Sequence, residues 1–309
     1  MNTMQTTIKH IAAVVGGTLL TLGLASPALA AGPTGEYAAF NECPLSAPNI
    51  NACVHSLTTS GGVKIGSSTT PVTDPIVFQG GETREITVIE NEVETRGGKE
   101  VVLEQRESRK FLPAANGETL SHSPQPIPGG LLGVVAPESL PAAVRDQITA
   151  MTSAGLAGTY ATTELVGPAE FSFDKVASKG VGLIMPTRIH LENALLGSEC
   201  YIGSASEPIT FHLTSGATSP PPPNESISGT PGEVEVRNGG KLVIAHNDSA
   251  VDNIFAVPTA QGCGGSLSPL LDQAIDLKLG LPSASGNNTA ILNGTLEQAS
   301  SGAVQESEG

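Results

Sequence analysis

The chain has 309 residues, of which 30 are acidic and 15 are basic, and its formal net charge at pH 7 is −15. Because nucleic acids and anionic lipids repel a strongly acidic protein, this charge argues against partners that are recognised through phosphate groups. Tryptophan is absent and aromatic residues are few, which argues against a sugar-binding platform of stacked rings and against an envelope porin with aromatic girdles.

Residues 1–30 have the features of a secretory signal peptide. Lys9 precedes an apolar run at 11–25, and Ala28-Leu29-Ala30 places small residues where a signal peptidase cleaves. The run is shorter than the roughly 20 apolar residues of a membrane-spanning helix, and no later stretch reaches that length. The sequence therefore predicts an exported, secreted protein without a membrane span.

The chain has four cysteines, all after the predicted cleavage point: Cys43, Cys53, Cys200 and Cys263. An even number of cysteines in an exported chain predicts two disulfide bonds, for which three pairings are possible. We favour Cys43–Cys53 and Cys200–Cys263, because the second bond would join two glycine-rich turns and hold a sheet around residues 191–203. A zinc site is the alternative, but the spacings match no common zinc pattern, and the only histidine close to a cysteine in sequence is His55.

The first strands are predicted between Gly61 and Leu103. Residues 31–60, before them, are expected to be irregular. Short runs of branched apolar residues at 63–65, 76–78 and 85–90 are typical of β-strands. Arg96-Gly97-Gly98-Lys99 has the composition of a hairpin turn that leads into a strand at 101–103. The proline- and glycine-rich residues 111–137 predict a long loop.

A helix is predicted to follow this loop. Ser139 can cap it, and Leu140, Val144, Ile148 and Met151 have helical spacing. A second run of strands begins near Val181, where residues 188–192 and 209–214 alternate between apolar and polar, as in antiparallel strands with one buried face.

The four prolines at 220–223 predict a stiff surface loop. Residues 237–241 (RNGGK) predict a hairpin turn between strands at 234–236 and 242–244. Strands are also expected at 255–257 and 289–296. Between them, Ser268 as cap and Pro269 in the first turn predict a second helix that ends at Gly280.

Together these elements predict a mainly β fold, namely an antiparallel β-sandwich or partly closed β-barrel with two short helices. The expected organisation is a signal peptide at 1–30, a single disulfide-linked β-rich domain at 31–298 and a disordered acidic tail at 299–309. The motif LLGSECYIGS, with PPPPN and AQGCGG downstream, resembles a family of exported actinobacterial proteins with no known activity. The resemblance covers roughly residues 180–300 and implies export and disulfide bonds, but no function.

Familiar catalytic motifs are absent from the sequence. It has no Gly-x-Ser-x-Gly elbow, no His-Glu-x-x-His helix, no phosphate-binding Gly-Lys-Ser/Thr loop and no dinucleotide fingerprint. One weak constellation remains, because His190 and Glu192 share a strand face and His212 lies on the polar face of another strand. These side chains could bind a transition metal or act as acid and base, but a solvated polar face is the favoured interpretation.

Two other patterns favour structural roles. Glu90, Glu92 and Glu94 alternate along one strand, where charge discourages edge pairing, and no calcium-binding loop surrounds them. His246-Asn247-Asp248-Ser249 favours a turn over part of a catalytic triad. Four asparagines begin glycosylation triplets: Asn224, Asn247, Asn287 and Asn293.

No residue is assigned a catalytic, metal-binding or cofactor-binding role. The sequence favours a secreted, non-enzymatic extracellular or cell-envelope protein that binds a partner or a small apolar ligand, without a cofactor. This expectation comes from the architecture, since a cupped sheet covered by helices can hold such a ligand. The alternative is a secreted hydrolase with an unfamiliar site near His190 and His212.

Overall fold

The computed structural model describes residues 32–95, 98–130, 139, 141–146 and 158–308. The predicted signal peptide and the hairpin-turn residues Arg96 and Gly97 lie outside this part of the chain. So does most of the helix predicted from Ser139, of which residues 142–146 are described and are helical. The described residues from Gly32 onward form one compact unit.

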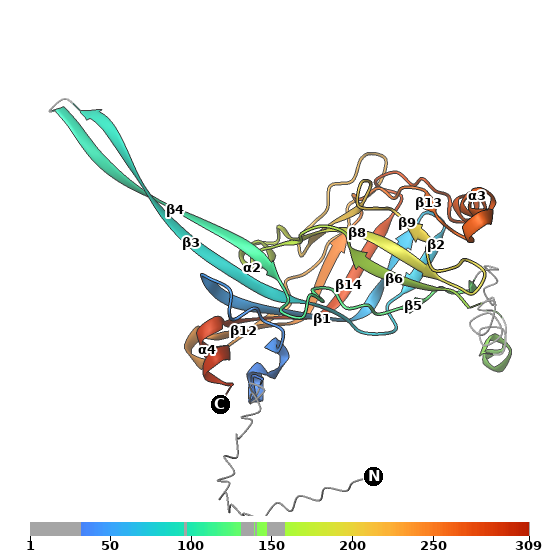
Figure 1. Cartoon of the computed structure of the whole chain (residues 1–309), viewed down its shortest axis with the longest axis horizontal. Coiled ribbons are helices and arrows are strands. Elements are labelled where there is room, and N and C mark those ends of the chain that lie inside the picture. Colours follow the sequence, from blue (N-terminus) through green and yellow to red (C-terminus); the bar gives the residue numbers. More distant parts are fainter. Residues whose placement is uncertain (1–31, 96–97, 131–138, 140, 147–157, 309) are drawn as a thin grey trace, which may run out of the picture. The chain divides into compact units, whose positions relative to one another are not determined.

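The described residues are mainly β, as the sequence predicts (Figure 1). The strands are β1 (Ile50–Ile65), β2 (Ser68–Pro71), β3 (Ile76–Thr95), β4 (Gly98–Pro113), β5 (Gln125–Pro126), β6 (Tyr160–Leu165), β7 (Glu170–Phe171), β8 (Val181–Glu192), β9 (Tyr201–Ile202), β10 (Ile209–Thr214), β11 (Glu233–Arg237), β12 (Leu242–Asp252), β13 (Ala260–Gln261) and β14 (Thr289–Ser300). The helices are η1 (Gly35–Phe40), α2 (Phe173–Ala177), η3 (Asn238–Gly240), η4 (Gly265–Leu267), α3 (Ser268–Leu279) and α4 (Ser301–Glu306).

All strand pairs in this sheet are antiparallel. Its main path runs β13-β9-β8-β10-β12-β14-β1-β3-β4, and β2, β5, β6, β7 and β11 attach at its sides. The sheet curls, because β7 pairs with β8 yet lies beside β4 at the far end of the path. Phe111 of β4 and Phe171 of β7 have ring centroids 6.1 Å apart across this seam. The fold is therefore a curled antiparallel sheet, which agrees with the predicted partly closed barrel.

The main core lies on the concave face of the sheet. In β8 and β10 the residues at every second position are buried, for example Ile189, Leu191, Ile209 and Phe211. Successive side chains of a strand point to opposite faces, so this alternation sends one apolar set inward and one polar set outward. The alternation in the sequence therefore predicted the inward face of both strands correctly.

A second, smaller core lies on the other face of the sheet and corrects two predictions. Residues 31–60 are not all irregular, because β1 begins at Ile50. The residues 301–306 are not disordered, because they form α4, which begins with the Ser300 hydroxyl accepting a hydrogen bond from the Ala303 N–H. Val304 is fully buried in this core beside Phe40. Ala303 and Val304 are an apolar pair in an otherwise polar segment, and their burial provides the apolar contact that a disordered segment lacks.

Further differences concern short segments. Residues 255–257 are not a strand, because within the described chain Val257 forms only an isolated bridge with Ser283. The cap of α3 is Leu267 rather than Ser268, whose hydroxyl instead donates to Asp272 within the helix. The predicted hairpin between β11 and β12 is present, and the proline run forms a largely exposed loop.

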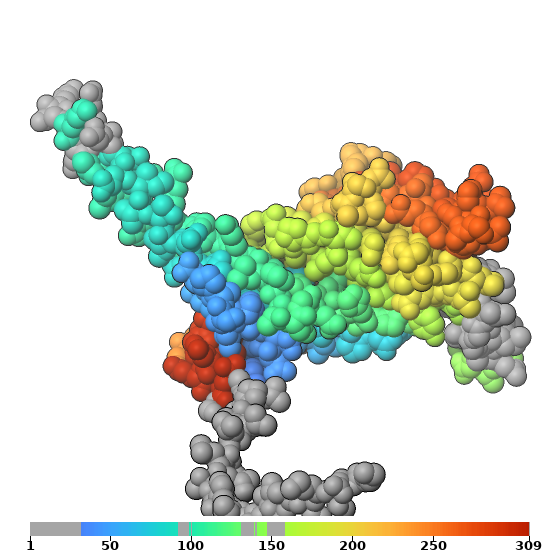
Figure 2. Space-filling model, viewed as in Figure 1, coloured from blue at the N-terminus to red at the C-terminus, as the bar shows by residue number. Residues whose placement is uncertain are grey.

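Beyond the rest of the sheet, β3 and β4 continue as a two-stranded ribbon (Figure 1). β1 pairs with β3 only as far as Thr83, whereas β3 pairs with β4 from Gly80 to Thr95. Among the described strands, the segments 84–95 and 98–109 therefore pair only with each other, and they are drawn in space-filling form in Figure 2. From the sequence, these two long strands were predicted only as short, separate runs at 85–90 and 101–103.

Candidate functional site

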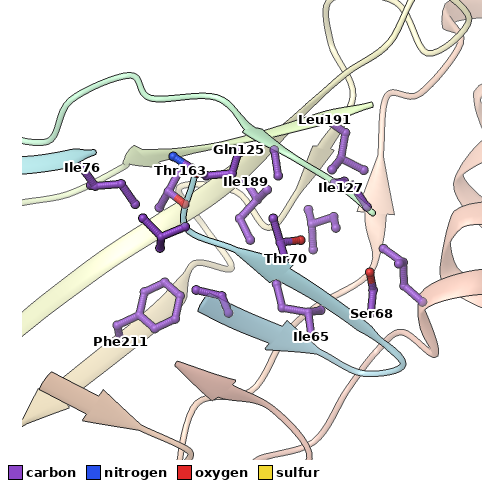
Figure 3. A pocket seen from close by; sticks show the side chains of 15 residues that line it. Ile65, Ser68, Thr70, Ile76, Gln125, Ile127, Thr163, Ile189, Leu191 and Phe211 are labelled. Carbon is purple, nitrogen blue, oxygen red and sulfur yellow. The ribbon is translucent and has the colours of Figure 1, made fainter. Parts of the chain in front are cut away.

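The concave face of the curled sheet contains an apolar cavity of about 70 Å³. Figure 3 shows side chains from several strands that surround it. No charged side chain of the described chain lines the cavity. Its walls are Val63, Ile65, Val72, Ile76, Ile127, Ala161, Ile189, Leu191, Ile202, Phe211 and Leu279, together with the polar residues Ser68, Thr70, Gln125 and Thr163.

Gln125 is the largest polar residue of the wall, and its amide is fully used by the backbone. Its Oε1 accepts hydrogen bonds from the N–H groups of Thr73 and Asp74, at 2.8 and 3.1 Å. Its Nε2 donates to the carbonyl groups of Asp74 and Ser123, at 2.8 and 3.1 Å. Gln125 therefore fixes the bend that follows β2 and leaves no polar atom for a ligand.

Three hydroxyl groups remain in the wall, those of Ser68, Thr70 and Thr163, and all three residues are partly buried. In the described chain, none of these hydroxyls has a hydrogen bond to another protein group. A hydroxyl can both donate and accept. The cavity thus combines an apolar wall with a few polar groups that a ligand can engage.

One side of the cavity is covered by the end of α3, and this cover is attached at both ends. Leu279, the last residue of α3, lines the cavity, and its carbonyl accepts a hydrogen bond of 2.9 Å from the N–H of Ser67 in the β1–β2 turn. Nearer the start of the helix, the carboxylate of Asp272 accepts hydrogen bonds from the N–H groups of Gly262 and Cys263, at 3.2 and 2.8 Å. These bonds hold the helix in one position, which favours a preformed cavity.

The predicted disulfide bonds are both present. Cys263 is bonded to Cys200 with an S–S distance of 2.07 Å, and both residues are fully buried. The bond links the turn that holds α3 to the segment after β8, so it joins the cover of the cavity to its wall. Cys43 and Cys53 are bonded in the smaller core, and the described chain has no free cysteine.

A second cavity of about 40 Å³ lies farther along the concave face, and Asp248 lines it among apolar residues that include Phe78 and Leu296. A β-bulge between His246 and Asp248 changes the register of β12. Because the bulge adds a residue, Asp248 points inward although His246 points outward. Burial raises the pKa of Asp248 from its ordinary value of 3.8 to about 6, and its Oδ1 is buried without a hydrogen-bond partner in the described chain.

Glu82 is another buried carboxyl group on the same concave face. It is only 3 % exposed, and its Oε2 accepts a hydrogen bond of 2.6 Å from Gln298. Burial raises its pKa, and the nearby positive charge of Arg109 opposes that effect. The concave face therefore changes from uncharged at the larger cavity to partly acidic toward β3.

The three residues of the weak histidine constellation do not meet. The His190 ring stacks on Tyr201 at 4.7 Å, and Glu192 accepts a hydrogen bond of 2.6 Å from the hydroxyl of Thr162. His212 pairs with Ile184 of β8, six residues from His190, which corresponds to a separation of about 20 Å along the strand. The geometry that an acid–base site at these residues requires is therefore not formed.

The other candidate residues have structural partners or lie apart. His246 contacts the carboxylate of Glu235 at 2.9 Å, on the face opposite Asp248, so the two do not form a triad fragment. Glu90 is exposed, and the side chains of Glu92 and Glu94 lie outside the described residues. In the described part of the chain, no group of three His, Cys, Asp or Glu residues is placed to hold a metal ion. No helix among those residues is long and apolar enough to cross a membrane.

Several strands that form the cavity wall were not predicted from the sequence. β2, β5 and β6 contribute Thr70, Gln125, Ala161 and Thr163, and none of these strands was predicted. β2 and β5 have only four and two residues, which is too short for a periodic pattern. The only available signal is in β6, whose sequence YATTEL contains two adjacent β-branched residues.

Comparisons of the chain with protein-family models, with curated proteins and with solved structures find no match. Neither a relative nor a structural neighbour therefore indicates an activity. The function is accordingly inferred from the geometry and chemistry of the apolar cavity.

Proposed function

We propose that this protein is a secreted, non-enzymatic protein of the extracellular space or cell envelope that binds a small apolar ligand in the cavity of its concave face. The observation that supports this proposal is an uncharged cavity in which the one amide group is fully hydrogen-bonded to the backbone. Export is supported by the signal-peptide features of residues 1–30 and by the two disulfide bonds, which persist in oxidising compartments.

The size of the cavity limits the ligand. Its volume of about 70 Å³ is close to half of the about 150 Å³ of an engineered apolar cavity that binds benzene. The cavity therefore suits a short alkyl chain or a small branched group rather than a fused ring system. The free hydroxyls of Ser68, Thr70 and Thr163 suit one polar group on that ligand, such as a hydroxyl or a carbonyl.

The first experiment is native mass spectrometry of the protein purified from culture medium, which detects retained small molecules. The second is a titration with 1-propanol, used as a probe with one short alkyl chain and one hydroxyl, and followed by calorimetry. Binding should also raise Tm, since a ligand that binds only the folded state stabilises it by about 2.7 kcal/mol at 100 times its Kd.

A variant that fills the cavity gives the decisive comparison. Ala161→Phe adds a ring at the wall, so it should abolish 1-propanol binding. Ala217→Phe makes the same change at an exposed position and should leave binding intact. Equal 1-propanol binding by the wild type and by a folded Ala161→Phe variant would contradict the proposed site. No binding of 1-propanol, together with no retained molecule, would contradict the proposed function.

A further inference from the structure

The ribbon formed by residues 84–95 and 98–109 exposes apolar side chains. Val88 is 52 % exposed, Val101 is 56 % exposed and Leu103 is 62 % exposed. All three lie on one face of the ribbon, because residues opposite each other in the register share a face and every second residue of a strand returns to it. Asp174 of α2 binds Arg109 at the base of the same face, at 2.8 Å, but Val88, Val101 and Leu103 remain about half exposed or more.

The ribbon also has two free edges. β4 pairs only with β3 among the described strands, and β3 has no second strand beside it beyond Thr83, although the N–H of Arg84 still donates to the carbonyl of Asn49. A two-stranded hairpin is marginally stable in water, and a third strand or a packed surface is normally required. The ribbon, with twelve residues in each arm, therefore has two edges at which a further strand can pair.

The charges of the two edges differ. Residues 84–95 of β3 include one arginine and four glutamates, so pairing two copies of this edge would bring like charges together. Residues 98–109 of β4 include three basic and three acidic residues in mixed order. Charges of one sign protect an edge against pairing, whereas mixed charges can complement each other across a two-fold axis.

We propose that the β4 edge is a dimer interface and that its partner is the β4 edge of a second copy of this chain. The two strands pair antiparallel, with Leu103 of one copy opposite Leu103 of the other. This register places Glu100 opposite Arg106 and Lys99 opposite Glu107, twice each by symmetry. The two ribbons then form one four-stranded sheet with an apolar centre and oppositely charged pairs at both ends.

The oligomeric state of the mature protein tests this proposal. Sedimentation velocity and native mass spectrometry, over a range from about 1 to about 200 µM, should show a concentration-dependent dimer, because a strand pair is a small interface. Arg106→Glu should weaken this dimer at least about tenfold, because it places like charges opposite each other twice. The double variant Glu100→Arg/Arg106→Glu restores opposite charges and should restore the dimer.

Arg237→Glu is a matched control. Arg237 pairs with Glu235 two residues earlier on the same strand, at 2.7 Å, just as Arg106 pairs with Glu104 at 3.0 Å. The control should leave the dimer unchanged. A wild-type protein that stays monomeric at the highest concentration would overturn the proposal, as would a dimer that Arg106→Glu does not weaken. Failure of the double variant to recover the dimer would overturn the register with Leu103 at its centre.

Discussion

The buried carboxyl group of Asp248 leads to a specific prediction about stability and pH. The perturbation is Asp248→Asn, which keeps the shape of the side chain and removes its charge. In the wild type, burial raises the pKa of this group from 3.8 to about 6, and no basic group contributes to the shift. The folded state therefore binds the proton more tightly than the unfolded state does.

The sign of the effect follows from that difference. Between about pH 4 and pH 6 the folded state binds more protons, so stability decreases as the pH rises through this range. The displacement of the pKa corresponds to at most about 3 kcal/mol, at 1.36 kcal/mol for each pH unit. Because part of Asp248 still reaches solvent, we expect about 1 to 2 kcal/mol in practice.

Equilibrium urea denaturation with intact disulfides, at about pH 4.5, 6 and 8, measures this effect. The free energy of unfolding of Asp248→Asn relative to the wild type should increase by about 1 to 2 kcal/mol between pH 4.5 and pH 8. Burial of the amide in the variant lowers its free energy of unfolding by an amount that does not depend on pH. The prediction is therefore tested by how the difference in stability between the variant and the wild type changes with pH. Asp74→Asn, at an exposed aspartate, is the control. A difference that is flat with pH, or that decreases as the pH rises, would refute the assignment of Asp248 as a buried carboxyl group without a charged partner.

Two further predictions concern the parts of the fold outside the cavity. Replacing Cys200 and Cys263 by serine should reduce the free energy of unfolding by about 4 kcal/mol, and replacing Cys43 and Cys53 by about 3 kcal/mol, because the first bond closes a longer loop. Urea denaturation of both double variants tests the order, and a larger loss for the Cys43 and Cys53 pair would contradict it. Val304→Ala should cost about 2 kcal/mol, because it leaves a void in the smaller core. Deletion of residues 301–309 should lower Tm as well, and an unchanged Tm would mean that α4 does not contribute to the fold.

Much of the fold was predictable from local patterns in the sequence. Alternation identified β8 and β10 together with their inward faces, because the two-residue period of a strand is independent of its neighbours. Glycine-rich turn sequences identified the hairpin between β11 and β12. The even number of cysteines and their place beside turns led to the correct disulfide pairs.

The predictions that failed depend on contacts between distant segments. Strands as short as β5 exist because a neighbouring strand supplies their hydrogen bonds, and no periodic pattern marks them. The tail forms α4 because Val304 finds a buried place beside Phe40, more than 260 positions earlier in the chain. The polar composition of the tail does not contain that information.

The candidate site also depends on contacts between segments that are distant in the sequence. The sequence by itself determined a disulfide-linked, antiparallel β protein, because periodicity, turn chemistry and cysteine number are local properties. Only the tertiary structure decided that Ile76, Ile189 and Leu279 line one cavity and that a bulge turns Asp248 inward. The curl of the sheet brings these residues together, and curl arises from pairing and packing over the whole chain rather than from any single segment.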